Sequence, residues 1–565
     1  MTAIDWLARL YPWPVRTSDE LTRALAFLDW AHRPAEVVRG GYGAAGLVGL
    51  ATAAFVVVAP ARYRLPAGLA GVAIALAVAH AVHAAPRLLA TAQRTSALGT
   101  APELLVLAVL RMRLSPSPER AADFAAETGT GRLAESLAGH VDRARGSNGT
   151  GLRTFGEEWD EWFPALGRGL GLVAAAGAVD AAERGRALDR AMSVVLDGTR
   201  RQMQDFAGSI RGPATGLYAF GVLLPTALVA LLPAARAAGL AVTPLAVATV
   251  YDVGLPLLLF AAGAWLLARR PVAVPPPRLG PDHPEVAERR VLAVVAALGA
   301  AGSGALVTAL AFPWWAPPIA AVGFGTGTWL TVRHRSAVAV AAEIRDVERD
   351  LTDALSVIGR RVAHGEAVER AIASAAADLD GATAAVFARG ARKQRQLDVG
   401  VRSAFLGEHG VLQTVPSPRV RGSVELLALA AHEGQPAGQA ILSMAGHLDD
   451  LRDVERAARE DVRTVVETLR STGAVFGPLV GGATVALAER MGAGGAALPG
   501  ATEPMTWLGL VVGAYALLLA TLLTAIATGL ERGFDRRLLG YRIGIALLSG
   551  TATFLCGYLG AAAVA

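Results

Sequence analysis

The chain has 565 residues and a mass of 58.2 kDa, and 53% of its residues are hydrophobic while only 18% are charged. Soluble domains carry about 25% charged residues. The composition, with a mean hydropathy of +0.42, therefore disfavours a soluble enzyme, a disordered chain and a secreted disulfide scaffold. The single cysteine, Cys556, excludes an intrachain disulfide and a cysteine-based metal site. The net charge of +5 gives nucleic-acid binding no global electrostatic support.

Apolar residues gather in segments of the length that crosses a bilayer, which is roughly 20 residues for a helix. The seventh of these segments is the weakest, because it is short and Glu489 and Arg490 follow it closely. The expected spans are Tyr42–Pro60, Pro66–Ala84, Ala214–Leu232, Thr249–Ala268, Val291–Phe312, Trp314–Val332, Ala474–Leu487, Thr506–Leu530 and Ile543–Gly560. The sequence predicts an all-α integral membrane protein with about nine transmembrane helices.

Residues 1–41 precede the first span and lack the apolar stretch of a cleavable signal peptide. Thr17 and Glu20 have the spacing of a capping box. Four apolar residues then recur at helical intervals, namely Leu21, Ala24, Leu25 and Leu28. We expect an amphipathic helical segment, which lies either on the membrane surface or against the protein as an ordinary soluble capping helix.

Two long polar stretches, 85–213 and 333–473, interrupt the spans. Both are rich in Ala, Leu, Arg and Glu and show no alternation of strand type, so each is predicted to be a helical-bundle domain. The predicted organisation is 1–41, amphipathic segment; 42–84, spans 1–2; 85–213, first domain; 214–268, spans 3–4; 269–290, linker; 291–332, spans 5–6; 333–473, second domain; 474–530, spans 7–8; 531–542, loop; and 543–565, span 9.

Arginine clusters set the expected orientation. The linker from Arg269 to Arg290 carries five arginines and the segment from Arg532 to Arg542 carries four. Short cytoplasmic loops are enriched in Lys and Arg. We therefore expect a cell (plasma) membrane protein whose N-terminus and both large domains are cytoplasmic and whose C-terminus is outside.

The layout repeats along the chain. Two spans, a polar helical region and two more spans occur twice in the same orientation, which is a parallel repeat. Pro118-Glu119-Arg120-Ala121-Ala122 and Val368-Glu369-Arg370-Ala371-Ile372 lie 250 residues apart. Each polar region ends in a long charged helix, and a Phe-Gly pair, Phe220-Gly221 or Phe476-Gly477, follows in the next span.

No catalytic motif emerges from the sequence. A Walker phosphate-binding loop needs a lysine before Ser or Thr, and the only lysine, Lys393, precedes Gln394. We expect no enzymatic activity, no cofactor and no bound metal. Asp252 lies within the fourth expected span, where an acid is either functional or caps the first turn of its helix, and we favour the cap.

Two groups of residues are candidates for interaction. Charged residues at the start of the echoed segments are usually a solvated face, but they are also candidates for docking a soluble partner. These docking candidates are Arg360, Arg361, Glu369, Arg370, Glu119 and Arg120. Candidates for close helix packing in the membrane are Gly477, Gly481, Phe220 and Phe476.

A duplicated helical bundle that feeds into membrane spans resembles the type II secretion system F-domain family, the inner-membrane platform proteins of type II secretion, type IV pili, Tad pili and archaella. The helix-turn segments Leu114–Glu127 and Val362–Ala377, the two Phe-Gly helix ends and Gly434–Ala440 carry the resemblance. About nine spans, against three in the simplest members, resemble the many-span branch of archaellum and archaeal pilus machines.

The resemblance implies a platform protein that couples a hexameric secretion ATPase in the cytoplasm to the insertion of pilin-like subunits into a growing filament, and that is commonly a homo-oligomer. It implies no nucleic-acid partner. The alternatives are a solute transporter or channel with a parallel internal repeat, for which Pro225, Pro256 and Asp252 are the candidate residues, and a membrane sensor or enzyme with cytoplasmic catalytic domains.

Overall fold

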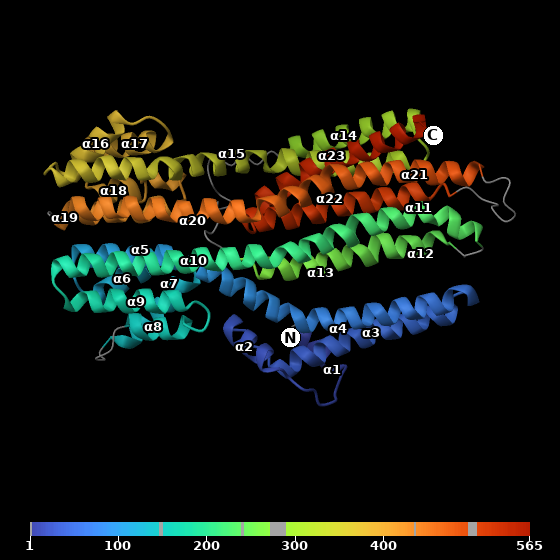
Figure 1. The fold of residues 1–565 in the computed structure, drawn as a ribbon, viewed down its shortest axis with the longest axis horizontal. Helices are drawn as coiled ribbons and strands as arrows, with labels where there is room; N and C mark the ends of the chain where they lie inside the picture. Colours follow the sequence, from blue (N-terminus) through green and yellow to red (C-terminus); the bar gives the residue numbers. More distant parts are fainter. Residues whose placement is uncertain are drawn as a thin grey trace. The chain divides into compact units, whose positions relative to one another are not determined.

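The computed structural model describes residues 3–145, 151–238, 242–271, 290–433, 437–494 and 505–564 (Figure 1). Within these residues every regular element is a helix, which confirms the predicted all-α class. The chain divides into two compact units. Unit 1 contains Met1–Ser96 and Ala264–Arg270, and unit 2 contains Ala97–Gly263 and Pro271–Ala565. Most of the predicted linker 269–290, and Gly434–Pro436 of the family-like segment, lie outside the described residues.

Unit 1 combines two short helices with two long apolar ones. Its helices are α1 (Ala3–Arg9), α2 (Asp19–Leu28), α3 (Pro34–Val58) and α4 (Ala61–Leu98). Ser18, not Thr17, caps α2, because its hydroxyl accepts a hydrogen bond from the Leu21 amide at 3.2 Å. The predicted apolar stripe of α2 is buried, and it packs against Val37, Val38 and Ala90. The protein itself therefore covers this stripe, as the capping-helix alternative requires.

Eight helical segments of the described chain are long enough, and contain a stretch apolar enough, to cross a membrane. They are Pro34–Val58, Ala67–Leu114, Ala181–Arg236, Pro244–Ala268, Arg290–Ala311, Ala437–Met491, Leu508–Arg532 and Arg536–Val564. These segments indicate a multi-pass membrane protein. The predicted count of nine is not reached, because Trp314–Val332 begins helix α15 (Ala316–Ala363), where glycine and threonine dilute the apolar residues.

The start of α15 is nevertheless an interior element of unit 2. It packs against α14 (Arg290–Ala311) and α23 (Arg536–Val564). Trp315 is completely buried and donates a hydrogen bond to Glu489 at 3.0 Å, and Tyr558 donates to the same carboxylate at 2.8 Å. These two donors explain how α21 (Gly477–Gly494) tolerates the acid that weakened its prediction as a span.

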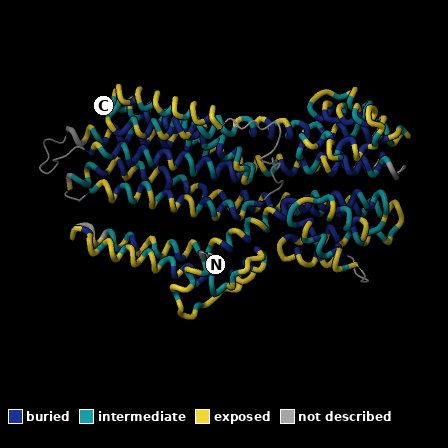
Figure 2. The backbone as a smooth tube through the Cα atoms, turned by 180° about the vertical axis from the view of Figure 1, so that it is seen from behind, coloured by how far each residue is buried: buried dark blue, intermediate teal, exposed yellow. Residues whose placement is uncertain are grey.

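Two helical domains in unit 2 have the same order of helices. The first consists of α5 (Ala101–Leu114), α6 (Pro118–Thr128), α7 (Arg132–Ala144), α8 (Gly151–Trp159), α9 (Pro164–Ala175) and α10 (Ala181–Tyr218). The second consists of the end of α15, α16 (Val368–Asp378), α17 (Ala382–Leu397), α18 (Val401–Leu406), α19 (Pro418–Glu433) and α20 (Ala437–Ser471). Figure 2 shows buried residues inside these bundles and exposed residues along their outer faces.

The correspondence between the two domains extends to single backbone angles. Helices α6 and α16 each have 11 residues, and each is followed by a turn that ends in a glycine. Gly131 has φ 86° and Gly381 has φ 101°, a region that side-chain-bearing residues rarely adopt. The two glycines cap α7 and α17 and lie 250 residues apart in the sequence (381 − 131).

The two long helices α10 and α20 lead from the domains toward the membrane segments, and each ends in a π-helical turn (Figure 1). The turns are η2 (Ala219–Leu223) and η5 (Thr472–Phe476), and a third π-turn, η3 (Thr249–Gly254), follows the short helix α12 (Pro244–Ala248). The remaining membrane helices are α11 (Leu224–Ala237), α13 (Leu255–Ala268) and α22 (Leu508–Arg532). Both Phe-Gly pairs identified in the sequence lie at such a turn.

The first testable expectation concerns Gly131, whose added Cβ would meet no atom within 4 Å. The change Gly131→Ala therefore tests backbone strain alone, and it should destabilise the protein by about 1–3 kcal/mol. Gly185→Ala in α10 is the matched control, because the site is helical and equally open, and it should be neutral or slightly stabilising. Thermal unfolding midpoints of the detergent-purified variants measure the difference, and equal midpoints would contradict the strained turn.

Candidate functional site

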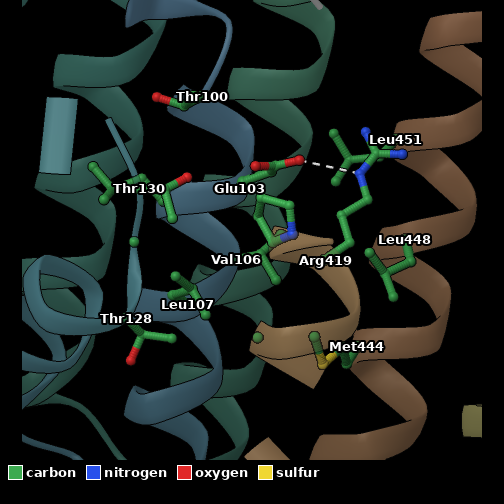
Figure 3. Close-up of a pocket in the computed structure, with 14 residues that line it drawn as sticks. Thr100, Glu103, Val106, Leu107, Thr128, Thr130, Arg419, Met444, Leu448 and Leu451 are labelled. Carbon is green, nitrogen blue, oxygen red and sulfur yellow. Dashed lines mark hydrogen bonds and ion pairs between the residues drawn. The ribbon is translucent and has the colours of Figure 1, made fainter. Parts of the chain in front are cut away.

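A buried ion cluster links the two helical domains of unit 2. Arg419 lies in the first turn of α19 with a side chain only 9% exposed. Its Nε donates to a carboxylate oxygen of Glu103 in α5 at 3.1 Å (Figure 3). Its Nη2 pairs with Glu455 in α20. One guanidinium of the second domain thus binds a carboxylate from each domain.

Residues close in sequence to Arg419 and Glu103 position these two side chains. Ser417 precedes α19, and its hydroxyl accepts from the Val420 amide at 3.3 Å and donates to Glu348 of α15 at 2.6 Å. This contact fixes the first turn of α19, where Arg419 lies. Glu103 lies in the first turn of α5, where a carboxylate suits the positive end of the helix dipole.

The carboxylates of the cluster stabilise the positive charge of Arg419. Burial opposes the positive charge and would lower the pKa of Arg419, but the carboxylates of Glu455 and Glu103 outweigh it and hold the pKa above its ordinary value. Arg419 is therefore charged. A buried charge with partners is tolerated, whereas removing one partner leaves the other uncompensated.

Glu103 and Arg419 of the cluster line a narrow cleft of about 530 Å³ (Figure 3). Hydroxyls of Thr100, Thr128 and Thr130 lie on the side of the first domain. Met444, Leu448 and Leu451 of α20 form the opposite wall. The described residues hold no group of three or more His, Cys, Asp or Glu side chains that could bind a metal. What this arrangement does best is hold two apolar helical surfaces together at a fixed register.

The docking candidates have different structural roles. Arg361 forms ion pairs with Glu366 at 3.3 Å and with Asp378 at 2.5 Å, so it closes the turn between α15 and α16. Arg360, Glu369 and Arg370 are exposed beside this turn. Arg361 is thus committed to the fold, while its three neighbours remain accessible.

Glu119 and Arg120 occupy the equivalent position at the start of α6 and are also exposed. The structure does not bring the two groups of docking candidates together, because α6 and α16 lie on opposite sides of the pair α10 and α20 (Figure 1). Any partner that contacts both groups must therefore be large, or must bind as two copies.

The packing candidates also divide. A Cβ at Gly477 would lie 2.9 Å from Leu519, and one at Gly481 would lie 3.5 Å from Val512, so both glycines face α22 closely. Phe220 and Phe476 are 56% and 58% exposed. Helices of this chain therefore cover less than half of each of these two side chains, and their role in helix packing stays a prediction.

Two tyrosines that the sequence analysis did not single out support the first π-turn. Pro225 has no N–H and cannot bond the carbonyl of Gly221 four residues earlier. The Tyr515 hydroxyl donates to that carbonyl instead. Tyr251 donates to the Pro225 carbonyl at 2.7 Å, and its ring packs edge-on against Tyr515 with 5.6 Å between centroids. Tyr515 of α22 therefore stabilises the π-turn at the end of α10.

Asp252 does not have the expected capping role. Thr243 caps this helical segment through a hydrogen bond from the Ala246 amide at 3.3 Å, and the segment begins at Pro244. Asp252 lies two turns farther on, in η3, with one carboxylate oxygen that is buried and lacks a hydrogen-bond partner. An unpaired acid within an apolar segment favours the transporter alternative.

Comparison of the chain with protein families, with curated proteins and with solved structures finds no match.

A second prediction tests the ion cluster. The change Arg419→Met leaves Glu103 buried without its guanidinium and leaves Glu455 with Arg459 alone, at 3.1 Å, so it should destabilise the protein by about 3–5 kcal/mol. Glu103→Gln removes one of two carboxylates that compete for Arg419 and keeps an acceptor oxygen, so it should change stability by less than about 1 kcal/mol. Thermal unfolding in detergent measures both variants, and equal losses would show that the cluster is not organised around Arg419.

A third prediction concerns the first π-turn. Tyr515→Phe removes the donor to the Gly221 carbonyl and should lower stability by about 1 kcal/mol. Pro225→Ala supplies a backbone N–H to that carbonyl, so the same tyrosine change should cost less in the alanine background. The double-mutant cycle isolates the coupling between the two residues, and additive effects would contradict the proposed compensation.

Proposed function

We propose that this protein is the membrane platform of a filament-assembly or secretion machine of the type II secretion and type IV pilus kind. In this role its two helical domains face the cytoplasm and receive the motion of a hexameric secretion ATPase. The membrane helices pass that motion to pilin-like subunits that enter a filament. The chain supplies no energy itself, and the cytoplasmic location of the domains belongs to the proposal.

The observation that carries the proposal is the pair of long helices. Helix α10 has 38 residues and α20 has 35, and each leads from a helical domain into a membrane segment. A helix rises 1.5 Å per residue, so each extends for more than about 50 Å. Continuous helices of this length transmit displacement from one end to the other, which a solute-binding protein does not require.

The joined domains support the same function. The Arg419 cluster ties α5 of the first domain to α19 and α20 of the second. A force applied to either domain is therefore shared by both long helices. The accessible charges at the starts of α6 and α16 are the proposed docking points for the ATPase, because complementary charge orients encounters between proteins.

A fourth prediction tests the docking surface with the full-length protein. Immobilised protein in detergent should capture a hexameric secretion ATPase from a lysate of its own host, and capture should weaken as salt rises. Reversing Arg360 and Arg370 to Glu should reduce capture at least about tenfold. Arg395→Glu, an exposed position on α17 of the same domain, is the matched control and should have little effect.

The outcomes separate the parts of the proposal. If capture survives the reversal of Arg360 and Arg370, the platform function would stand, but these two arginines would not be docking residues. Failure to capture any ATPase by a correctly folded protein would contradict the platform function. Solute-dependent flux in liposomes that is lost on Asp252→Asn would then favour the transporter.

A further inference from the structure

In unit 2, three arginines from three helices converge on one carboxylate near the turn that joins α22 to α23. Arg470 comes from the last turn of α20, Arg532 from the end of α22 and Arg542 from α23. Each pairs with Glu531: Arg470 and Arg542 at 2.5 Å, and Arg532 at 3.3 Å. Glu531 and Arg542 are each 21% exposed, so the cluster is partly removed from water.

Positive charge exceeds negative charge around this cluster. The neighbouring turn adds Arg536 and Arg537 and a single acid, Asp535, which caps α23 through the amides of Arg537 and Leu538. Burial and then the charge of Arg532 lower the pKa of Arg345 on α15. Burial, followed by the charges of Arg333 and Arg537, lowers the pKa of His334 in the same way. The site is therefore cationic despite its internal ion pairs.

The bias of membrane proteins toward arginine in short cytoplasmic loops explains exposed charges, but it does not explain their convergence. Here the guanidiniums of three separate helices share a single acceptor. The Nε of Arg470 is buried and has no hydrogen-bond partner. An anion with several acceptor oxygens would balance the surplus charge of these guanidiniums.

A cleft leads from the cluster along α20. It has about 1060 Å³ of open space and is lined by Glu531 and by successive turns of α20 from Arg456 to Arg470. The arginines farther from the membrane segments have partners within α20. Arg456 pairs with Asp453 at 2.7 Å, and Arg463 pairs with Glu460 at 3.4 Å and Glu467 at 2.8 Å. At the Arg470 end, by contrast, the cleft has an excess of positive charge and lies beside the apolar segments.

We propose that Arg470, Arg532 and Arg542 form a binding site for a phosphate oxyanion, and that the phosphate belongs to the headgroup of an anionic phospholipid. Planar guanidiniums match phosphate oxygens in pairs of parallel hydrogen bonds. The site lies where α22 and α23 leave the apolar region, which is the depth of lipid headgroups. This assignment does not depend on the proposed platform function.

The test titrates the full-length protein in detergent with short-chain phosphatidylglycerol, short-chain phosphatidylcholine or inorganic phosphate, and follows binding by native mass spectrometry and thermal shift. Phosphatidylglycerol should bind at least about tenfold more tightly than phosphatidylcholine, because only its headgroup has a net negative charge. Arg470→Gln and Arg542→Gln should each weaken the binding of phosphatidylglycerol at least about tenfold. Arg456→Gln is the control, since it lies 14 residues, about 21 Å, farther along the same helix.

Glu531→Gln should strengthen phosphatidylglycerol binding, whereas the arginine changes should weaken it. Removing this carboxylate frees the guanidiniums that it shares, so phosphatidylglycerol should bind more tightly than to the unchanged protein. If this variant or either arginine variant fails to fold, Arg532→Gln, whose ion pair is the longest, provides the loss of binding instead. A purely structural cluster would show no gain for any of these changes.

Three outcomes would overturn the proposal. Equal binding of the two lipids, or phosphatidylglycerol binding that Arg470→Gln and Arg542→Gln leave unchanged, would reduce the cluster to ordinary arginine enrichment. Inorganic phosphate that binds as tightly as phosphatidylglycerol, with the same dependence on Arg470 and Arg542, would replace the lipid with a free anion. Failure of ATPase capture would leave this result unaffected.

Discussion

A guanidinium buried between two domains constrains both of them. Arg419 is tolerated in the interior because Glu103 and Glu455 approach it from α5 and α20. Those two helices therefore meet α19 at the ion cluster. This contact sets how the apolar side chains around the cluster pack. The cleft wall formed by Met444, Leu448 and Leu451 faces α5 in the register that the ion cluster dictates. Separating the domains would expose these apolar surfaces and break the ion pair between Arg419 and Glu103, so the two domains are coupled energetically.

The coupled domains connect to the membrane segments through helices whose hydrogen-bond register changes at defined places. Each long helix is α-helical until its π-turn, where the hydrogen-bond register changes. π-turns are rare and frequently lie at functional positions. The two turns are not equivalent, because Tyr515 and Tyr251 fasten the region of η2, whereas η5 is followed by Gly477-Pro478 packed against α22 and α23. The duplicated halves thus have different contacts at matching positions.

Periodicity and composition predict much of this fold, because they report burial along one helix. The stripe of Leu21 and Leu25, the recurrence of α6 and α16, and the Phe-Gly helix ends could all be read from the sequence. Pairing between distant helices could not. Glu103 and Arg419 are 316 residues apart, and no local pattern relates them, although an acid in the otherwise apolar start of α5 was a visible signal. The exposure of Phe220 likewise depends on which helices surround it.

The two ends of the membrane helices in unit 2 handle buried acids in opposite ways. At one end Glu489 accepts hydrogen bonds from Trp315 and Tyr558, which are neutral donors. At the other end Glu531 lies among arginines from three helices. Neutral donors suffice to satisfy a single carboxylate, so the arginines at Glu531 exceed what that residue requires. The excess is unfavourable in isolation, because like charges in a partly buried site repel one another. A bound anion would relieve that repulsion, which is why this end of the molecule, and not the other, is suited to bind anionic lipid.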